Sequence, residues 1–455
     1  MSSVQQAVHI SKTLGVVVLA AGQGTRMHSS LPKVLHRLAG RSLLHHVLVQ
    51  VAALAPQEVV VVIPPDMPAI EQAAQPYPCV VQAPPRGTGH AVQCAMSALQ
   101  GLADEAAILV LYADTPLLEV ETLERLVQQH QKAGAVLSVM AMQLADAGRY
   151  GRVVLDQTGQ YVEKIVEYND ANEQERAISL ANAGMMLIQN GWLKQHIHKL
   201  QPNNAKGEFY LTDLVAMARG LGLPVTHGLL PEQQVGGINT RAELAAAEAV
   251  MQQRLRQRAL SRGVTLIDPS SVYFSADTVI AEDVTIHPHV YFGNNVSIGS
   301  FCEILPFCHL EGVDIGRNSR IGPFARLRPG AVLGEGVHIG NFVEIKNAQL
   351  GDGVKAGHLS YLGDATIGAG TNVGAGTITC NYDGSKKHHT NIGERVFIGS
   401  NTALIAPVSV GDGAYIGAGS VITRNVPADS LAVVRGEWRL IENYQPAKAP
   451  KKTGT

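Results

Sequence analysis

Three polar segments in the first half of the chain carry residue types that bind phosphate groups and a divalent cation. The first, residues 19–27 (LAAGQGTRM), has small residues that let backbone N–H groups approach an anion, while Arg26 and the nearby Lys33 add positive charge. The others are Gln82 with RGTGHA at 86–91, and YADTPL at 112–117, where the Asp114 carboxylate suits Mg²⁺ or caps a helix. A lone GxG also closes ordinary turns, and the first loop matches neither a Walker loop nor the dinucleotide GxGxxG. The three loops together therefore predict a phosphate site.

A second set of polar residues interrupts a glycine-rich, aliphatic stretch in the second half of the chain. Its cations can bind an anion, its amides and phenols can hydrogen-bond a sugar, and its imidazole can take a proton from an amine near neutral pH. The set is Arg328, Lys346, His358, Tyr361, Asn372, Asn381 and Tyr382. A lone histidine is more often a surface or core residue, but Tyr361 three residues on and the cations upstream make His358 the candidate general base.

The elements that position the first set alternate between short aliphatic runs and longer segments of helical character. The runs are residues 16–19, 59–63, 108–111 and 136–139. This alternation predicts an α/β domain over residues 1–239 with a mainly parallel, Rossmann-like sheet. Because ligands bind beyond the carboxyl ends of such strands, the loops at 19 and 112 lie where a nucleotide site is expected.

The elements that position the second set follow a period of six. Aliphatic or aromatic residues recur at 280, 286, 292, 298, 304 and 310, and the series resumes at 315 and again at 392, often with glycine next. Three hexapeptides close one triangular coil, which predicts a left-handed parallel β-helix over residues 263–455. The break at 380–390 (CNYDGSKKHHT) predicts a loop that leaves the coil. Taken alone, the repeat also allows a purely oligomerising scaffold.

A linker helix is predicted between the two domains, over residues 240–262. Thr240 and Glu243 have the spacing of a capping box, and the alanine-rich run ends at Gly263. Such a helix spans about 33 Å, which argues against direct channelling between the two sites. The tail from residue 445, rich in Pro, Ala and Lys, is expected to be mobile.

Composition excludes several classes of function. The net charge of −2 over 455 residues gives no basic field for nucleic acid or an anionic membrane, and the apolar run at 16–21 is too short to span a bilayer. Five scattered cysteines show no metal-ligand spacing, and Cys302 and Cys308 are expected to stay free thiols in a reducing compartment. We therefore expect a cytoplasmic protein.

The motifs LAAGQGTRM, LPKVL, RGTGHA and YADTPL together resemble those of sugar-1-phosphate nucleotidylyltransferases. With GPFARLRPG, GNFVEIKNA, KAGHLSYLGD and NVGAGTITCNYDG added, the chain resembles the bacterial bifunctional family of N-acetylglucosamine-1-phosphate uridylyltransferase and glucosamine-1-phosphate N-acetyltransferase. The resemblance implies acetyl transfer from acetyl-CoA to glucosamine-1-phosphate, then uridylyl transfer from UTP to N-acetylglucosamine-1-phosphate. It also implies Mg²⁺ as cofactor and a homotrimer.

The same resemblance assigns residues to each site. It implies that the UDP-sugar is bound by Leu19, Ala20, Ala21, Gly22, Arg26, Lys33, Gln82, Gly87, Thr88, Tyr112, Ala113, Asp114, Gly151, Glu167, Asn182, Thr212 and Asn239. Asp114 and Asn239 would hold Mg²⁺. For acetyl transfer it implies His358 as base, with the acceptor bound by Arg328, Lys346, Tyr361 and Asn372. Acetyl-CoA would be bound by Ala375, Asn381, Tyr382, Ser400, Ala418 and Arg435.

Two residues depart from the family pattern, and two other functions would each fit part of the sequence. Ala113 stands where the family usually has glycine, and Pro85 where a polar residue is common. One rival is a nucleotidylyltransferase of single activity with a scaffolding β-helix, against which His358 and the NYDG loop argue. The other is a non-catalytic assembly protein, against which the intact Asp114 and Asn239 pair argues.

Overall fold

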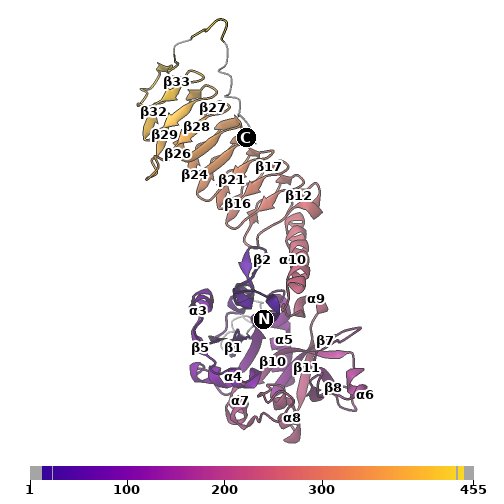
Figure 1. Ribbon diagram of the computed structural model, residues 1–455. Helices are drawn as coiled ribbons and strands as arrows, with labels where there is room; N and C mark the ends of the chain where they lie inside the picture. The colour runs from indigo at the N-terminus through magenta and orange to yellow at the C-terminus, as the bar shows by residue number, and fades with distance from the viewer. Residues whose placement is uncertain (1–12, 23, 437–438, 445–455) are drawn as a thin grey trace, which may run out of the picture. The chain divides into compact units, whose positions relative to one another are not determined.

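The computed structural model describes residues 13–22, 24–436 and 439–444. They form two compact units, which divide between Arg254 and Leu255 (Figure 1). The tail expected to be mobile lies outside the described residues. Within the described ranges, no helix is both long and apolar enough to cross a membrane.

The first unit is built on a nine-stranded sheet with the main order β11-β7-β10-β6-β1-β4-β5. Its strands are β1 (Leu14–Leu19), β4 (Glu58–Ile63), β5 (Cys79–Val81), β6 (Ala107–Tyr112), β7 (Leu137–Gln143), β8 (Arg152–Leu155), β9 (Val162–Val166), β10 (Leu180–Gln189) and β11 (Val225–Leu229). β1 pairs in parallel with β4 and β6, whereas β10 runs antiparallel to β6 and β7. The continuous aliphatic runs of β1, β4 and β6 fit a sheet that is buried on both faces.

Helices cover both faces of this sheet, which explains its two hydrophobic cores. One core packs α2 (Leu43–Ala53), α3 (Pro68–Ala74) and α5 (Val120–Ala133) against Val16 and Val18 of β1. The other packs α4 (Thr88–Ala95), α7 (Asn190–His196) and α8 (Asp213–Gly220) against Val17. Short helices α6 (Glu173–Arg176) and α9 (Glu232–Val235) complete the unit. The predicted mainly parallel α/β fold is confirmed.

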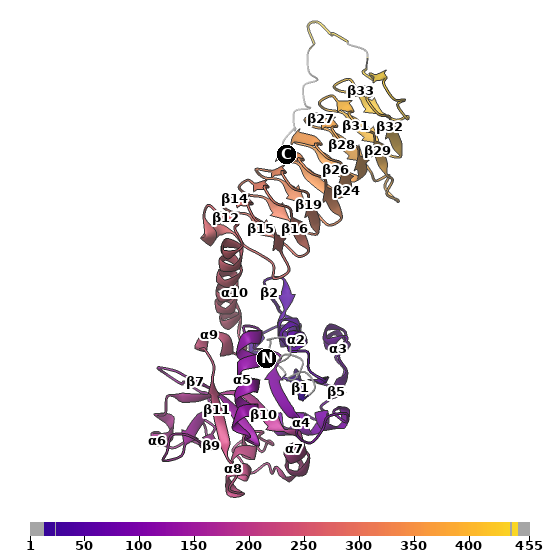
Figure 2. The same ribbon diagram turned by 180° about the vertical axis from the view of Figure 1, so that it is seen from behind.

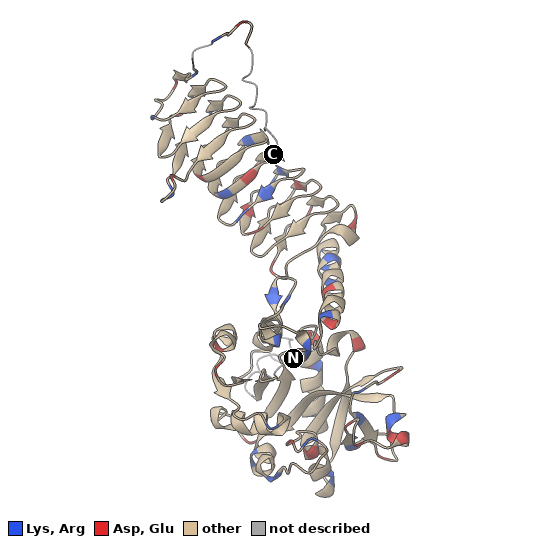
Figure 3. Ribbon diagram, viewed as in Figure 1, with Lys and Arg blue, Asp and Glu red and all other residues tan. Residues whose placement is uncertain are grey.

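A 21-residue helix, α10 (Arg241–Ser261), follows the first sheet. Its first turn has the predicted capping box, because Glu243 N–H donates to Thr240 Oγ1 and the Glu243 carboxylate accepts from Thr240 N–H. Figure 3 shows residues of both charge signs along α10; the acidic ones lie in its first half, and the charged residues of its second half are arginines.

The second unit is a stack of triangular coils whose short strands pair only in parallel. One face runs β12-β14-β17-β20-β23-β25-β27-β30-β33-β35, and the other two faces join into a 14-stranded sheet. The first face contains β12 (Thr265–Leu266), β14 (Thr285–Ile286), β17 (Glu303–Ile304), β20 (Arg320–Ile321), β23 (His338–Asn341), β25 (Lys355–His358), β27 (Asn372–Val373), β30 (Phe397–Ile398), β33 (Tyr415–Ile416) and β35 (Leu431–Ala432). Figures 1 and 2 show these coils stacked in order along the unit.

The other two faces meet along the middle coils. One contains β13 (Val279–Ile280), β16 (Val296–Ile298), β19 (Val313–Ile315), β22 (Ala331–Leu333), β29 (Thr390–Ile392) and β32 (Val408–Val410). The other contains β15 (Tyr291–Phe292), β18 (His309–Leu310), β21 (Arg326–Leu327), β28 (Ile378–Cys380), β31 (Ala403–Ile405) and β34 (Val421–Ile422). Two seven-residue strands, β24 (Glu344–Leu350) and β26 (Tyr361–Ile367), pair with both faces and therefore turn the corner between them.

The period of six arises because the aliphatic side chains point into the coil and the corners leave no room for a side chain. Ile286, Ile304, Ile321 and Ile339 stack in register and are fully buried. At the corner a Cβ on Gly340 would lie 1.8 Å from the carbonyl oxygen of Gly357 in the next coil, so only glycine fits. The predicted hexapeptide β-helix is thereby confirmed.

Candidate active sites

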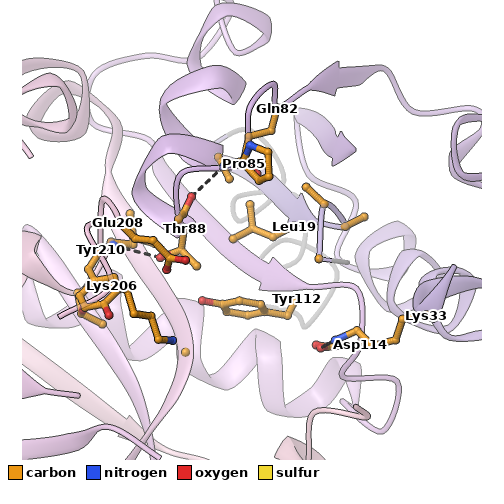
Figure 4. Close-up of a pocket in the computed structure, with 18 of the residues that line it drawn as sticks. Leu19, Lys33, Gln82, Pro85, Thr88, Tyr112, Asp114, Lys206, Glu208 and Tyr210 are labelled. Atoms are coloured by element: carbon orange, nitrogen blue, oxygen red, sulfur yellow. Dashed lines mark hydrogen bonds and ion pairs between the residues drawn. The ribbon is translucent and has the colours of Figure 1, made fainter. Parts of the chain in front are cut away.

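A pocket of about 660 Å³ opens at the carboxyl ends of β1 and β6, where the sequence predicts a nucleotide site (Figure 4). The carboxyl end of β1 delivers the loop from Leu19, and β6 delivers Tyr112 and Asp114. Figure 4 shows Gln82 and Pro85 at one end of the pocket, with Lys33 and Asp114 at another. The pocket therefore has one end of amide and loop groups and a second end of opposite charges.

The charged end holds a lysine, a carboxylate and an amide in direct contact. Lys33 is only 8% exposed, forms an ion pair with Asp114, and donates to Oδ1 of Asn239 over 3.0 Å. Asn239 Nδ2 in turn donates to the Gly237 carbonyl, which leaves Oδ1 turned toward the cluster. The oxygens of Asp114 and Asn239 thus contact the same ammonium group, that of Lys33. Such a pair of oxygens also suits Mg²⁺, which is bound by few protein carboxylates and otherwise keeps waters or phosphate oxygens as ligands.

The opposite side of the pocket is lined by groups suited to a polar, uncharged ligand. Burial, more than any neighbouring charge, raises the pKa of Glu167, and burial with Asp114 raises the pKa of Tyr112. Burial also raises the pKa of Tyr210 to about 12. Gly184, at φ +84°, lets the Tyr112 ring lie where a Cβ would stand 2.8 Å from it. The phenols of Tyr112 and Tyr210 stay protonated and, together with the Glu167 carboxyl, offer hydrogen bonds for sugar hydroxyls.

In the β-helix, residues of successive coils form one column that contains the predicted base. Backbone hydrogen bonds between coils place Asn341, His358, Ala375, Ser400 and Ala418 at equivalent corners, one above the other. Strands in a sheet are about 4.8 Å apart, so the column from His358 to Ala418 extends roughly 14 Å. Small residues above the imidazole leave a narrow strip along which an extended ligand can lie.

The imidazole of His358 has a defined orientation in this column. Its Nδ1 lies 2.6 Å from Oδ1 of Asn341, which can only accept a hydrogen bond, so the proton belongs on Nδ1. The Nε2 lone pair of the exposed ring is then available to take a proton.

A basic group and a buried polar network lie where β24 and β26 turn the corner. A contact with Lys387, together with the positive charges of Lys387 and Arg328, lowers the pKa of Lys346. Arg328 also donates to Glu344 over 2.7 Å. Two like-charged ammonium groups in contact are costly unless an anion joins them. This arrangement suits an anion such as a phosphate monoester.

The network beneath these cations is centred on Asp364. Its carboxylate accepts from Nδ2 of Asn347 over 2.5 Å and from Nδ2 of Asn381. Burial alone raises the pKa of Asp364, but the two amide hydrogen bonds and the nearby lysines outweigh it, and the net shift is downward. Asp364 therefore stays ionised and holds the long strands and the following loop together.

Both units match known families. Residues 16–194 match the model of the MobA-like NTP transferase domain, and residues 312–347 and 389–424 match that of the bacterial transferase hexapeptide (six repeats). The bifunctional protein GlmU of Paramagnetospirillum magneticum is 50% identical over 97% of this chain and 99% of its own length. The chain belongs to the GlmU family. The GlmU proteins of Paracoccus denitrificans and Zymomonas mobilis are 50% and 48% identical, each over 94% of this chain and 95% of their own length.

GlmU membership confirms the resemblance read from the motifs. The two stretches matched by the hexapeptide model flank residues 348–388, and this intervening segment contains His358, Tyr361, Asn381 and Lys387. The family model therefore leaves unmatched the segment that holds these residues of the predicted second site, although inward positions there, such as Leu362 and Ile367, stay aliphatic and buried.

The structure brings most of the residues predicted for the first site of this GlmU chain into one pocket. The predicted residues among its lining are Leu19, Ala20, Ala21, Gly22, Arg26, Lys33, Gln82, Gly87, Thr88, Tyr112, Asp114, Glu167, Asn182 and Thr212. Asn239 joins through Lys33, and Gly151 lies behind Glu167, whose carboxylate a Cβ there would meet at 3.3 Å. Ala113 differs, because its side chain is fully buried under the loop and does not line the pocket.

The predicted residues of the second site occupy neighbouring faces. Tyr361 and Asn381 are joined by a 3.5 Å hydrogen bond, and Asn372 pairs with Lys355 one coil below. Arg435 donates to the Ala418 carbonyl at the upper end of the column, whereas Tyr382 is exposed and donates to Gly384 of its own loop. Lys346 lies beside the Asp364 network, and Arg328 lies near Lys346.

Sequence reasoning missed several residues that contribute to these sites. In the pocket they are Lys206, Glu208 and Tyr210; in the β-helix they are Asn341, Asp364 and Lys387. A signal existed for Asn341, which lies 17 residues before His358, about one coil of the solenoid. Lys387 lies in the loop that leaves the coil, where the six-residue period gives no position.

Proposed function

We propose that this chain makes UDP-N-acetylglucosamine in two steps, one in each unit. The β-helix transfers acetyl from acetyl-CoA to glucosamine-1-phosphate, and the α/β unit then joins the product to UTP and releases pyrophosphate. Membership of the GlmU family supports the pair of reactions. The observation that carries the proposal is that each unit holds one cluster suited to its own step, Lys33 with Asp114 and Asn239 in the first and Asn341 with His358 in the second.

In acetyl transfer, the 2-amine of glucosamine-1-phosphate attacks the thioester carbonyl. A C–N bond forms, the C–S bond breaks, and coenzyme A leaves as a thiolate that takes up a proton. Nε2 of His358 removes the proton from the amine, because Nδ1 keeps its own proton and donates it in a hydrogen bond to Oδ1 of Asn341. Lys346, Lys387 and Arg328 bind the phosphate, while Tyr361 and Asn372 hold the sugar.

Acetyl-CoA binds along the column above His358. Ala375, Ser400 and Ala418 leave its strip free of large side chains, and Arg435 lies at the upper end, where its charge suits the coenzyme's phosphates. Asn381 and Tyr382 border the acetyl end from the loop that leaves the coil.

In uridylyl transfer, a phosphate oxygen of N-acetylglucosamine-1-phosphate attacks the α-phosphorus of UTP. A P–O bond forms on one side, and the bond to the β-phosphate breaks on the other. No protein nucleophile is needed, so the chain contributes position and charge. Lys33 and Arg26 neutralise the phosphates, the amides of the Leu19 loop bind them, and Glu167, Asn182 and Thr212 hold the sugar.

Asp114 and Asn239 would hold the magnesium ion, with Lys33 moving from their oxygens to the phosphates. When bound, Mg²⁺ offsets the charge that develops on the leaving pyrophosphate. The shared contact of both oxygens with Lys33 is the observation that supports this pair.

We further propose that the chain works as a homotrimer. Phe307, Phe324 and Phe342 stack outside the coils with centroids 4.8 and 5.2 Å apart, and each ring is about half exposed. Leu359, directly after His358 in the chain, is a further exposed apolar residue, at 62% exposure. Such an apolar stripe beside a catalytic group fits burial against a second copy of the chain.

A single assay tests the two reactions together. Purified protein is given glucosamine-1-phosphate, acetyl-CoA, UTP and Mg²⁺, and each component is withheld in turn. UDP-N-acetylglucosamine should form only with all four, and thiol release should persist without UTP. Pyrophosphate release from N-acetylglucosamine-1-phosphate without any acetyl transfer would instead establish a nucleotidylyltransferase with a scaffolding β-helix. The five cysteines, all unpaired in the structure, favour the cytoplasm as its site of action.

A further inference from the structure

The side-chain amide of Gln82 is buried at one end of the nucleotide pocket, and both of its N–H groups are engaged. Nε2 lies 2.9 Å from the carbonyl oxygen of Gly87 and 3.3 Å from Nδ1 of His90. None of the described residues donates a hydrogen bond to Oε1. Oε1 is also not one of the fully buried side-chain atoms that lack a partner, so it remains accessible. Since Gln82 lines the pocket, Oε1 is its one group left for a ligand, and that group is an acceptor.

The orientation of this amide depends on the Gly87 carbonyl and on His90. Nδ1 can accept from Gln82 only if the imidazole is neutral with its proton on Nε2, and Nε2 lies 3.7 Å from Sγ of Cys94, one turn further along α4. Burial, and then the charge of Arg86, lower the pKa of His90, so the ring is neutral at pH 7. A reversed amide would turn Oε1 onto the Gly87 carbonyl and bring two acceptors together.

The backbone that carries the Gly87 carbonyl is fixed as well. Gly87 has φ +100°, and a Cβ there would lie 2.6 Å from the Phe209 carbonyl oxygen. Phe209 N–H donates to Arg86 and its carbonyl accepts from Gly89, each over 2.8 Å. The loop therefore cannot shift to relieve a misplaced amide, and the Gly87 carbonyl and Nδ1 of His90 together hold the orientation of Gln82.

An acceptor at this point distinguishes two pyrimidines. Uracil has a donor at N3, whereas cytosine has a lone pair there, which an amide oxygen would repel. We propose that His90 is a positioning residue that holds the Gln82 amide in the orientation that selects uracil over cytosine. This inference rests on the proposed uridylyl transfer and names the group that sets its base specificity.

The test compares kcat/KM for UTP and for CTP in variants at position 90. His90→Phe keeps a ring but loses the acceptor, whereas His90→Asn places an amide oxygen near the position of Nδ1. Loss of one hydrogen bond corresponds to about a tenfold change. We therefore expect His90→Phe to reduce the UTP/CTP ratio about tenfold, and His90→Asn to restore most of it. KM for N-acetylglucosamine-1-phosphate should not change.

A second histidine–glutamine pair outside the pocket supplies a matched control. Nδ1 of His198 lies 2.7 Å from Nε2 of Gln93 on the protein surface, and neither residue lines the pocket. His198→Phe should leave the UTP/CTP ratio unchanged. An equal loss of activity toward both nucleotides in His90→Phe, or an unchanged ratio, overturns the inference. Absence of uridylyl transfer in the unaltered protein would instead overturn the proposed function itself, so the two failures are distinguishable.

Discussion

Nδ1 of His358 lies 2.6 Å from Oδ1 of Asn341, its register partner one coil below. The two residues occupy the last positions of β25 and β23, so the parallel pairing of the coils sets their separation. The amide oxygen selects the tautomer in which Nε2 is free, and it fixes the orientation of the ring. The coil below His358 would therefore prepare it for the proposed proton transfer, as a carbonyl or carboxylate partner orients histidines in other sites.

Removal of that partner should slow acetyl transfer without abolishing it. We expect Asn341→Ala to lower kcat for coenzyme A release by about 10- to 100-fold, because the ring loses its orientation and tautomer but keeps its lone pairs. KM for acetyl-CoA should change little. Asn341→Asp keeps an acceptor but adds negative charge, which stabilises the imidazolium. The rise of activity with pH should then move to higher pH, and an unmoved profile would contradict the assigned contact.

The two activities should be separable by single substitutions. His358→Ala should reduce acetyl transfer by several orders of magnitude, because no other described imidazole occupies the column, while uridylyl transfer persists. Asp114→Ala should abolish uridylyl transfer, because the ion pair with Lys33 and the proposed magnesium ligand are both lost, while acetyl transfer persists. Each reaction is measured alone, by thiol release and by pyrophosphate release. Loss of both activities from either change in a folded protein would refute the division of labour.

The exposed loop that leaves the coil should contribute to phosphate binding through Lys387. Its ammonium contacts that of Lys346, and a bound phosphate would relieve their repulsion. We expect Lys387→Met to raise KM for glucosamine-1-phosphate about tenfold with little change in kcat, as for loss of one charged hydrogen bond. Lys386→Met removes the same charge from the neighbouring exposed position and should have less than a twofold effect. Equal effects of the two substitutions would indicate only general attraction of the anion.

Much of this architecture is predictable from the sequence because its periods are strict. The spacing of Ile286, Ile304, Ile321 and Ile339 specifies coils of 17 or 18 residues, and stacking follows from burial of the aliphatic positions. The loops after β1 and β6 could be placed at one pocket because the strands are parallel. These features depend on residue type and interval alone.

Other features depend on where the chain departs from its period. β24 and β26 pass a corner without breaking, which places Asp364 inside and lets it bind Asn347 and Asn381. The spacing of aliphatic residues in the sequence does not predict that these two strands continue through the corner. Likewise, the contact between Lys33 and Asn239 joins residues 206 positions apart, so only the folded sheet brings them together.

Glu167 should lower the stability of the folded protein, and this effect should depend on pH. Because burial raises its pKa, the folded protein binds the proton more tightly than the unfolded chain does. The resulting stability is present below the unfolded pKa, near pH 4, and is lost as pH rises through the folded value. At pH 7, well above the unfolded pKa, the buried carboxyl therefore opposes folding, and Glu167→Gln should raise the midpoint of thermal unfolding by a few degrees.

The advantage of Glu167→Gln should shrink at pH 4, where the wild-type carboxyl is protonated and resembles the amide. The substitution should at the same time raise KM for N-acetylglucosamine-1-phosphate, because the proposed sugar contact is altered. Glu105→Gln changes an exposed carboxylate and serves as the control, with no effect on either quantity. Calorimetry at both pH values measures the difference. A Glu167→Gln protein less stable than the wild type at pH 7 would show that the carboxylate makes a favourable contact which outweighs its burial.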